Sequence, residues 1–225
     1  KSFDASKAKA VPGVVDVVPM PTGLAVVAEN TWAAIKGREA LTVEWDDSKA
    51  EKRSSAQLAE EFRALLAKPA AATARKDGDV DAAFKAAATT LEATYEFPYL
   101  AHAALEPMNA VARFNADGTL EVWGGHQIPA IHQQVAAGVG GVAPDKVVLH
   151  VMKTGGGFGR RATADGDIIQ EVVAVAKTVG KPVKMQWTRE DDMRGGRYRP
   201  MYVHSVKAGL DSGGALVAWR HHIVG

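Results

Sequence analysis

A run of glycines at residues 154–161 limits the folds open to this chain more than any other feature. It reads TGGGFGRR, so four of the five residues 155–159 lack a Cβ. Glycine adopts positive φ and lets backbone N–H groups approach a ligand closely. The apolar segment 147–152 has the composition of a strand, and Asp165 to Val179 has helical periodicity. Strand, glycine loop and helix in this order present amides to an anion, so the run predicts mixed α and β structure around an anion site.

The run does not match the two common glycine motifs. A P-loop needs GxxxxGK[ST], and no lysine stands at that spacing. The dinucleotide fingerprint GxGxxG would place its last glycine at Arg160 or Ala162. Taken alone, the run is equally compatible with a plain connection between a strand and a helix.

Composition narrows the classes of function. The 225 residues suffice for one or two domains with a buried core. The net charge of +1 gives no electrostatic argument for nucleic acid, and no apolar stretch approaches the roughly 20 residues of a membrane span. Because cysteine is absent, we expect no disulfide, no thiol catalysis and no iron–sulfur cluster ligated by this chain.

Residues 1–50 have the pattern of a small α/β unit. Turns that contain proline and glycine precede two β-rich runs, and Asn30 or Thr31 can cap a helix after the second. The expected strands are 14–18, 24–28 and 41–45.

Residues 51–90 are expected to form a helical linker. Ser54 or Ser55 caps an amphipathic helix that Pro69 stops, and a second, short helix covers 81–88. The alanine-rich polar stretch between the two helices lacks apolar periodicity and is expected to be irregular.

Residues 91–225 have the pattern of a larger unit with mixed strands and helices, which makes the whole chain α+β. The expected strands are 91–97, 110–114, 120–123, 147–152, 183–188, 201–210 and 215–224, and the expected helices are 129–139 and 165–179. The strand pattern still runs when the sequence stops at Gly225, so we expect a piece of a longer protein.

Three further clusters carry possible chemistry, and each also has a purely structural interpretation. Glu106 precedes a proline in 102–109 and could bind turn amides; Gln127 lies in 124–129 and could cap the next helix. The segment 189–200 reads as a dense charged loop, which could be solvated surface. No histidine spacing matches a metal site, and no GxSxG elbow supports nucleophilic hydrolysis.

Taken in order, these motifs resemble the molybdenum-binding large subunit of the xanthine dehydrogenase and aldehyde oxidoreductase family. The arginine pair and the WTREDDM segment look most like the isoquinoline 1-oxidoreductase β-subunit branch, and 12–46 resembles the small hammerhead domain of the family. The matching motifs are HxxxEP at 102–107, GHQxP at 125–129, GGGFGRR at 155–161 and PVKxxWTRE at 182–190.

The resemblance implies a hammerhead-like domain at 1–50, a helical linker at 51–90 and part of a mixed-sheet molybdopterin-binding domain at 91–225. The implied cofactor is molybdopterin with molybdenum, in the cytosine dinucleotide form, with Gln127 reaching the oxo group of the metal. Backbone amides of the glycine run would contact the pterin and the ligands of the metal, and a guanidinium beside them suits an anion. The predicted cofactor-binding residues are Gln127, Gly156, Gly157, Phe158, Gly159 and Arg160.

Two departures from the family pattern limit what the resemblance implies. Arg161 and Ala162 stand where many members carry a lysine and a substrate-binding glutamate. The family's general-base glutamate lies in a late Gly-Glu motif that Glu106 and Glu190 do not match. We therefore assign no catalytic residue and no protein ligand to a metal, and we expect the chain alone neither to retain molybdenum nor to turn over substrate.

The implied parent protein hydroxylates an N-heterocycle or an aldehyde with oxygen from water and passes electrons to a separate small iron–sulfur subunit. A different class stays open: a non-catalytic module that binds an anion or nucleotide-like ligand, or that assists assembly. The sequence leaves open the substrate, the electron acceptor, the oligomeric state and the compartment, bacterial cytoplasm or periplasm.

Overall fold

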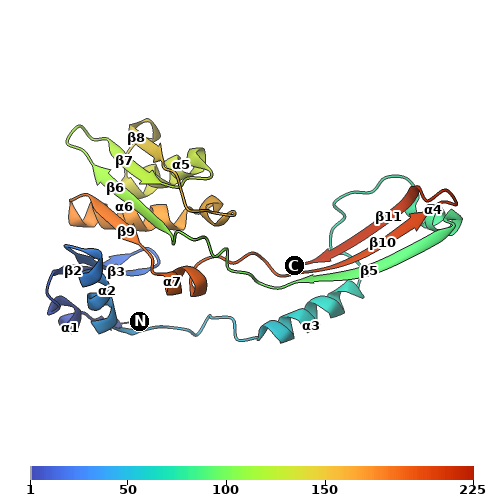
Figure 1. Ribbon diagram of the computed structural model, residues 1–225, viewed down its shortest axis with the longest axis horizontal. Coiled ribbons are helices and arrows are strands. Elements are labelled where there is room, and N and C mark those ends of the chain that lie inside the picture. Colours follow the sequence, from blue (N-terminus) through green and yellow to red (C-terminus); the bar gives the residue numbers. More distant parts are fainter. Residues whose placement is uncertain (1) are drawn as a thin grey trace. The chain divides into compact units, whose positions relative to one another are not determined.

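Residues 2–225 are described by a computed structural model, in which the chain forms two compact units, each built from two separated segments (Figure 1). The first unit joins Lys1–Lys49 to Ala101–Arg197, and the second joins Ala50–Leu100 to Tyr198–Gly225. Pairing of strands 89–97 and 202–210 joins the two segments of the second unit, and packing of residues 14–20 against residues 167–179 joins those of the first. Contacts at such a distance leave no local signal in a sequence. The predicted domain limits at residues 50 and 90 stay a prediction.

A four-stranded mixed sheet forms the centre of the first unit. Its strands are β6 (Asn109–Phe114), β7 (Leu120–Gly124), β8 (Val147–Val151) and β9 (Val183–Gln186), in the spatial order β8-β7-β6-β9. Strands β7 and β8 run parallel, whereas β6 is antiparallel to both of its neighbours. These strands confirm the sequence prediction of mixed helix and sheet.

Helices α5 (Pro129–Gly140) and α6 (Asp167–Val179) pack against each other and against this sheet. Helix α6 buries an apolar stripe at the helical spacing that the sequence predicted. Glycines in the left-handed conformation end both helices, Gly141 at φ 72° and Gly180 at φ 66°. The fully enclosed side chains of the core include Leu120, Val122, Ile169, Val172 and Val173.

The N-terminal segment of the first unit contains a hairpin, a helix and a small two-stranded sheet. Strands β2 (Val14–Met20) and β3 (Gly23–Ala28) pair antiparallel, and the Asn30 side chain caps helix α2 (Thr31–Ala40) as predicted. Strand β4 (Thr42–Glu44) was also predicted, whereas its partner β1 (Ser2–Asp4) and the short helix α1 (Ser6–Lys9) were not.

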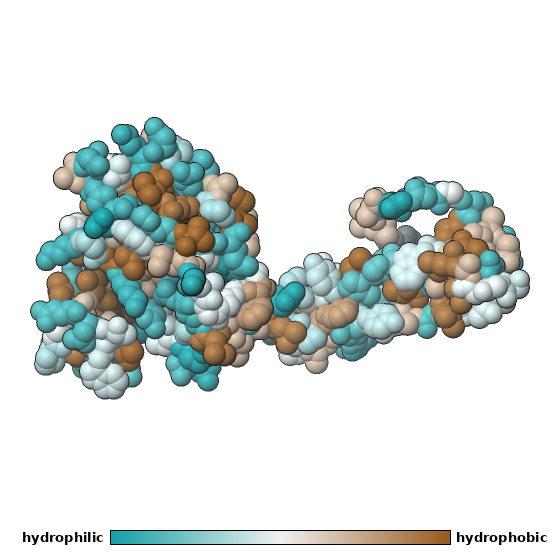
Figure 2. Space-filling view, turned by 45° about the horizontal axis from the view of Figure 1, so that its top comes forward, coloured by the Kyte–Doolittle hydropathy of each residue, from teal (hydrophilic) through white to brown (hydrophobic). Residues whose placement is uncertain are grey.

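The second unit is a long antiparallel sheet with helices. Strands β5 (Thr89–Phe97), β10 (Tyr202–Leu210) and β11 (Leu216–Val224) lie in the order β11-β10-β5. Helix α3 (Ser55–Leu66) begins with a capping box, and α4 (Val80–Ala86) follows an irregular stretch, as predicted. Hydrophobic residues reach the surface of both units in Figure 2. No helix in residues 2–225 combines the length and apolar character needed to cross a bilayer.

One prediction about the secondary structure is wrong. The charged segment that the sequence placed in a loop begins with a helix, α7 (Arg189–Arg194). Thr188 and Asp191 form a capping box at its start, because each side chain accepts the backbone N–H of the other. This reciprocal cap stabilises six residues whose charge density had suggested a solvated loop.

Removing methyl groups from the α6 stripe should destabilise the first unit. Val172 is fully buried, so Val172→Ala should lower the free energy of unfolding by about 2 kcal/mol, since it removes buried apolar surface and leaves a cavity. The matched control is Val148→Ala on β8, where the side chain is 42% exposed and the change should cost about 0.5 kcal/mol or less. Urea unfolding measures both, and equal losses would contradict this core.

Candidate functional site

The four sequence motifs meet at one edge of the central sheet. Strand register aligns Asn109 with Gln186 and Gly124 with Val151, so β6 begins where β7, β8 and β9 end. The segments that follow or precede these strand ends therefore leave the sheet on the same side. They are the HxxxEP segment, the GHQxP segment, the glycine loop (residues 154–161) and the segment that starts at Trp187.

The backbone of the glycine loop adopts positive φ at three residues. Gly156, Phe158 and Gly159 have φ values of 101°, 53° and 100°. Within residues 2–225, the structure gives no acceptor to the N–H groups of residues 156–159. Successive amides in such a conformation form an anion-binding concavity. The positive φ of Phe158, whose side chain is 65% exposed, costs about 1–2 kcal/mol and indicates a conformation imposed by its surroundings.

Gln127 lies against this loop. Its Oε1 accepts the backbone N–H of Arg161 at 3.1 Å, and a Cβ on Gly157 would lie 2.6 Å from the same oxygen. Helix α5 begins after Ile128 without any side-chain cap, so the alternative role of Gln127 as a helix cap is wrong. Gln127 therefore lies beside the glycine loop, and its contact with a cofactor stays a prediction.

Glu106 holds the start of the loop. Its carboxylate accepts the N–H of Gly155 at 2.7 Å, the amide of Asn109 at 2.6 Å and the Arg161 guanidinium at 3.1 Å. Partial burial opposes ionisation, but the bonds from Gly155 and Asn109 and the charge of Arg161 outweigh it and lower the pKa of Glu106. At neutral pH Glu106 is an ionised anchor whose oxygens are already engaged.

The side chains of Arg160 and Arg161, the last two residues of the glycine loop, are buried. Arg160 forms a two-pronged ion pair with Asp167, at 3.0 and 2.6 Å, and lies over the ring of Trp187 at 5.3 Å. Arg161 donates to Glu106 and to the backbone carbonyls of residues 106, 107 and 109. The terminal nitrogens of Arg160 are thus occupied by Asp167, and a contact between Arg160 and a cofactor stays a prediction.

Two histidines form a hydrogen-bonded pair that the sequence did not predict. The Nδ1 atoms of His126 and His132 lie 2.9 Å apart, and both rings are buried. Burial, reinforced by the neighbouring His132, lowers the pKa of His126 to about 4, and burial also lowers the pKa of His132. The pair therefore stays neutral near pH 7, where one Nδ1 donates to the other.

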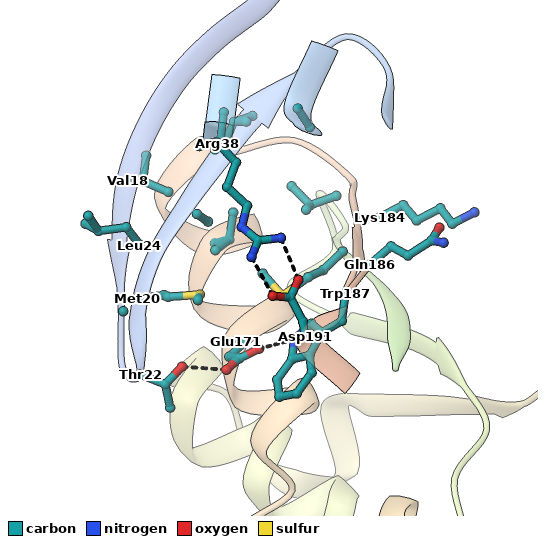
Figure 3. A pocket seen from close by; sticks show the side chains of 18 of the residues that line it. Val18, Met20, Thr22, Leu24, Arg38, Glu171, Lys184, Gln186, Trp187 and Asp191 are labelled. Atoms are coloured by element: carbon teal, nitrogen blue, oxygen red, sulfur yellow. Dashed lines mark hydrogen bonds and ion pairs between the residues drawn. The ribbon is translucent and has the colours of Figure 1, made fainter. Parts of the chain in front are cut away.

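A groove of about 1580 Å³ lies in the first unit, where the β2–β3 hairpin and helix α6 contribute to its lining (Figure 3). Two contacts join its walls: Arg38 forms a two-pronged ion pair with Asp191, and Thr22 donates to the buried Glu171. Glu171 also accepts the indole N–H of Trp187 at 3.0 Å. Glu171 was not predicted as a site residue, because it lies at the same helical spacing as the apolar residues around it.

Comparison with known proteins identifies the family. Residues 65–225 match the molybdopterin cofactor-binding domain. The chain belongs to this family. It is the molybdopterin-binding domain of the xanthine dehydrogenase and aldehyde oxidoreductase family, as the motifs predicted.

Individual relatives show how much of a larger protein the domain represents. The beta chain of isoquinoline 1-oxidoreductase from Brevundimonas diminuta is 34% identical, over 98% of this chain and 29% of its own length. A Gluconacetobacter polyoxogenes protein named membrane-bound aldehyde dehydrogenase (pyrroloquinoline-quinone) is 33% identical, over 97% of this chain and 29% of its own length. The chain thus spans less than a third of these relatives.

Solved structures confirm the fold. Quinoline 2-oxidoreductase from Pseudomonas putida 86 superposes with a TM-score of 0.71 at 17% identity, over 99% of this chain and 33% of its own. At that identity the likeness concerns the fold alone.

The molybdopterin-binding domain has a site that fits an anionic, oxo-bearing cofactor. Within residues 2–225 no acceptor pairs with the N–H groups of residues 156–159, and Gln127 adds a side-chain amide next to them. Any side chain at position 157 would narrow the space beside Gln127. Within residues 2–225 no three histidine or acidic side chains gather where they could bind a metal ion directly.

The histidine pair predicts a pH-dependent stability of this domain. His126 has an ordinary pKa of 6.5 when unfolded and about 4 when folded, so the unfolded state binds more protons in between. Stability contributed by the neutral pair is present above pH 6.5 and is lost as the pH falls toward 4. Unfolding in urea at several pH values should show the wild type losing stability relative to His126→Gln across this window; a constant difference would contradict a buried neutral pair.

Proposed function

We propose that this domain holds the molybdenum cofactor in the catalytic subunit of a hydroxylase. The enzyme would oxidise an N-heterocycle or an aldehyde with oxygen from water and pass the electrons to a separate iron–sulfur subunit. The observation that carries the proposal concerns four successive N–H groups, those of residues 156–159, beside Gln127. Within residues 2–225 no acceptor pairs with them.

When bound, the molybdenum cofactor supplies the transfer of oxygen and the acceptance of electrons. The protein residues of this domain would position it and stabilise negative charge. The amides of Gly156, Gly157, Phe158 and Gly159 would donate hydrogen bonds, and the carboxamide of Gln127 would donate from a position beside them. Because Glu106 and Gln127 already hold the loop, these donors need little rearrangement before binding.

Acid–base chemistry is not assigned to the carboxylates around the loop. Glu106 pairs with Arg161, Asp167 with Arg160, and Asp192 with Arg189. A carboxylate whose oxygens already accept hydrogen bonds from a guanidinium is not free to take a proton from a substrate. The general base of the proposed reaction would therefore come from residues other than these three.

The relatives support a partner chain, and the family resemblance supports the pterin form. Two relatives are named as single subunits, one of isoquinoline 1-oxidoreductase and one of nicotinate dehydrogenase, which supports an assembly of several chains. Since this chain has no cysteine, we place the iron–sulfur clusters on the partner. We propose the cytosine dinucleotide form of the pterin from the resemblance to the isoquinoline 1-oxidoreductase branch.

A glycine substitution tests the amide site. A Cβ on Gly157 would lie 2.6 Å from Gln127 Oε1, so Gly157→Ala should displace the carboxamide and disturb the amides. The matched control is Gly138→Ala in α5, where a Cβ would meet nothing within 4 Å. In anaerobic titration with molybdopterin cytosine dinucleotide, Gly157→Ala should bind about tenfold more weakly than the wild type, the equivalent of one lost hydrogen bond to a charged group. Gly138→Ala should bind as the wild type does.

Comparison ligands decide between the candidate functions. Binding of pyrophosphate as tight as that of the pterin dinucleotide would favour a general anion-binding module, and tighter binding of pyrroloquinoline quinone would favour a different cofactor. Either result would overturn the proposal. If the purified 225-residue chain contained stoichiometric molybdenum and reduced a dye, it would be catalytically active. The inference that these residues include no general base would then be wrong.

A further inference from the structure

A line of contacts connects the β2–β3 hairpin to the glycine loop. The Thr22 hydroxyl donates to one oxygen of Glu171, and the indole N–H of Trp187 donates to the other at 3.0 Å (Figure 3). The ring of Trp187 lies under the guanidinium of Arg160 at 5.3 Å. The backbone N–H of Arg160 then donates to the carbonyl of Gly157 at 2.8 Å and closes the turn of the loop.

The carboxylate at the middle of this line is costly to bury. Glu171 is 2% exposed, and its two hydrogen bonds come from neutral donors. Burial raises the pKa of Glu171, while the bonds from Thr22 and Trp187 act against that rise. A leucine at this α6 position would extend the apolar stripe, so stability does not account for the carboxylate. Its two bonds do have a geometric effect: they set the orientation of the Trp187 indole.

The orientation of Trp187 matters because Arg160 has little room. A Cβ on Gly196, which has φ 77°, would lie 2.5 Å from a terminal nitrogen of Arg160 and 3.1 Å from the Trp187 ring. On the opposite edge, Asp167 fixes both terminal nitrogens. A tilt of the indole would therefore force the guanidinium, and with it the turn at Gly157, to move.

We propose that Glu171 is a positioning residue for the anion site of the glycine loop, and that Thr22 assists it from the N-terminal hairpin. Glu171 orients Trp187, Trp187 supports Arg160, and Arg160 holds the turn that aims the amides of residues 157–159. The N-terminal segment thereby takes part in shaping a loop more than a hundred residues away in sequence. The relevance for the cofactor rests on the proposed function, whereas the effect on the loop does not.

Amide hydrogen exchange by NMR on the 225-residue chain tests the effect on the loop. The probes are the hydrogen-bonded amides of Arg160, Arg161 and Ala162. Glu171→Ala removes both bonds to the carboxylate and Trp187→Phe removes the bond from the indole, and in both variants we expect exchange at these three amides to rise about tenfold. Glu171→Gln keeps an acceptor for the indole and a donor for Thr22, so it should restore exchange to near the wild-type rate. Thr22→Val should give a smaller rise than Glu171→Ala, because the Trp187 bond remains.

Two controls separate positioning from a general loss of stability. The amide of Gly155 is held by Glu106, outside the line, and its exchange should not change. Val172→Ala destabilises the same helix without touching the line, so it should leave the ratio of exchange at Arg160 to exchange at Gly155 unaltered. Unchanged exchange at residues 160–162 in Trp187→Phe, or an equal rise at Gly155, would overturn the inference.

Titration of the same variants with molybdopterin cytosine dinucleotide keeps the two proposals distinguishable. A rise in exchange together with about tenfold weaker binding supports both. A rise in exchange in a chain whose wild type does not bind the pterin dinucleotide would support the positioning role and reject the proposed function. Weaker binding without any change in exchange would reject the positioning role and leave the amide site as proposed.

Discussion

The structure around the site depends on one constraint: the glycine loop must be held firmly without using the amides of residues 156–159. Backbone amides are the usual means of fixing a loop, but within residues 2–225 no acceptor pairs with these four, and we propose that they bind a ligand. The protein fixes the loop instead by its two ends. Glu106 binds the N–H of Gly155, and the two buried arginines bind at the other end. Between these ends, the N–H groups of residues 156–159 have no acceptor within residues 2–225.

Buried ion pairs suit this purpose better than apolar contacts. Arg160–Asp167 and Arg161–Glu106 add little net stability, because desolvation opposes the attraction between the charges. They are directional, however, and a two-pronged guanidinium–carboxylate pair fixes both distance and angle. A loop that must present four donors in a fixed direction benefits from that geometry. The histidine pair behind Gln127 adds a neutral contact to the same wall of the site.

Much of the fold was predictable because its signals are local. The apolar stripe of α6, the glycines that end α5 and α6, and the caps at Asn30 and Ser54 all depend on residues within one helix. The wrong prediction for 189–194 had a local signal too, since Thr188 and Asp191 have the capping-box spacing. Grouping of the compact units was not predictable, because β5 pairs with β10 across more than a hundred residues.

The sequence by itself determined the motifs and their order, and from these the family, because glycine, glutamine and arginine at set spacings carry the chemistry of the site. It determined that Gln127 and the glycine loop belong together. Only the tertiary structure decided what the neighbouring side chains do. It turned Arg160 and Arg161 inward to carboxylates, gave Glu106 a structural partner at Gly155 and brought Glu171 to Trp187. The physical reason is that a side chain's partner depends on which strand ends share an edge of the sheet, and that edge is set by long-range pairing.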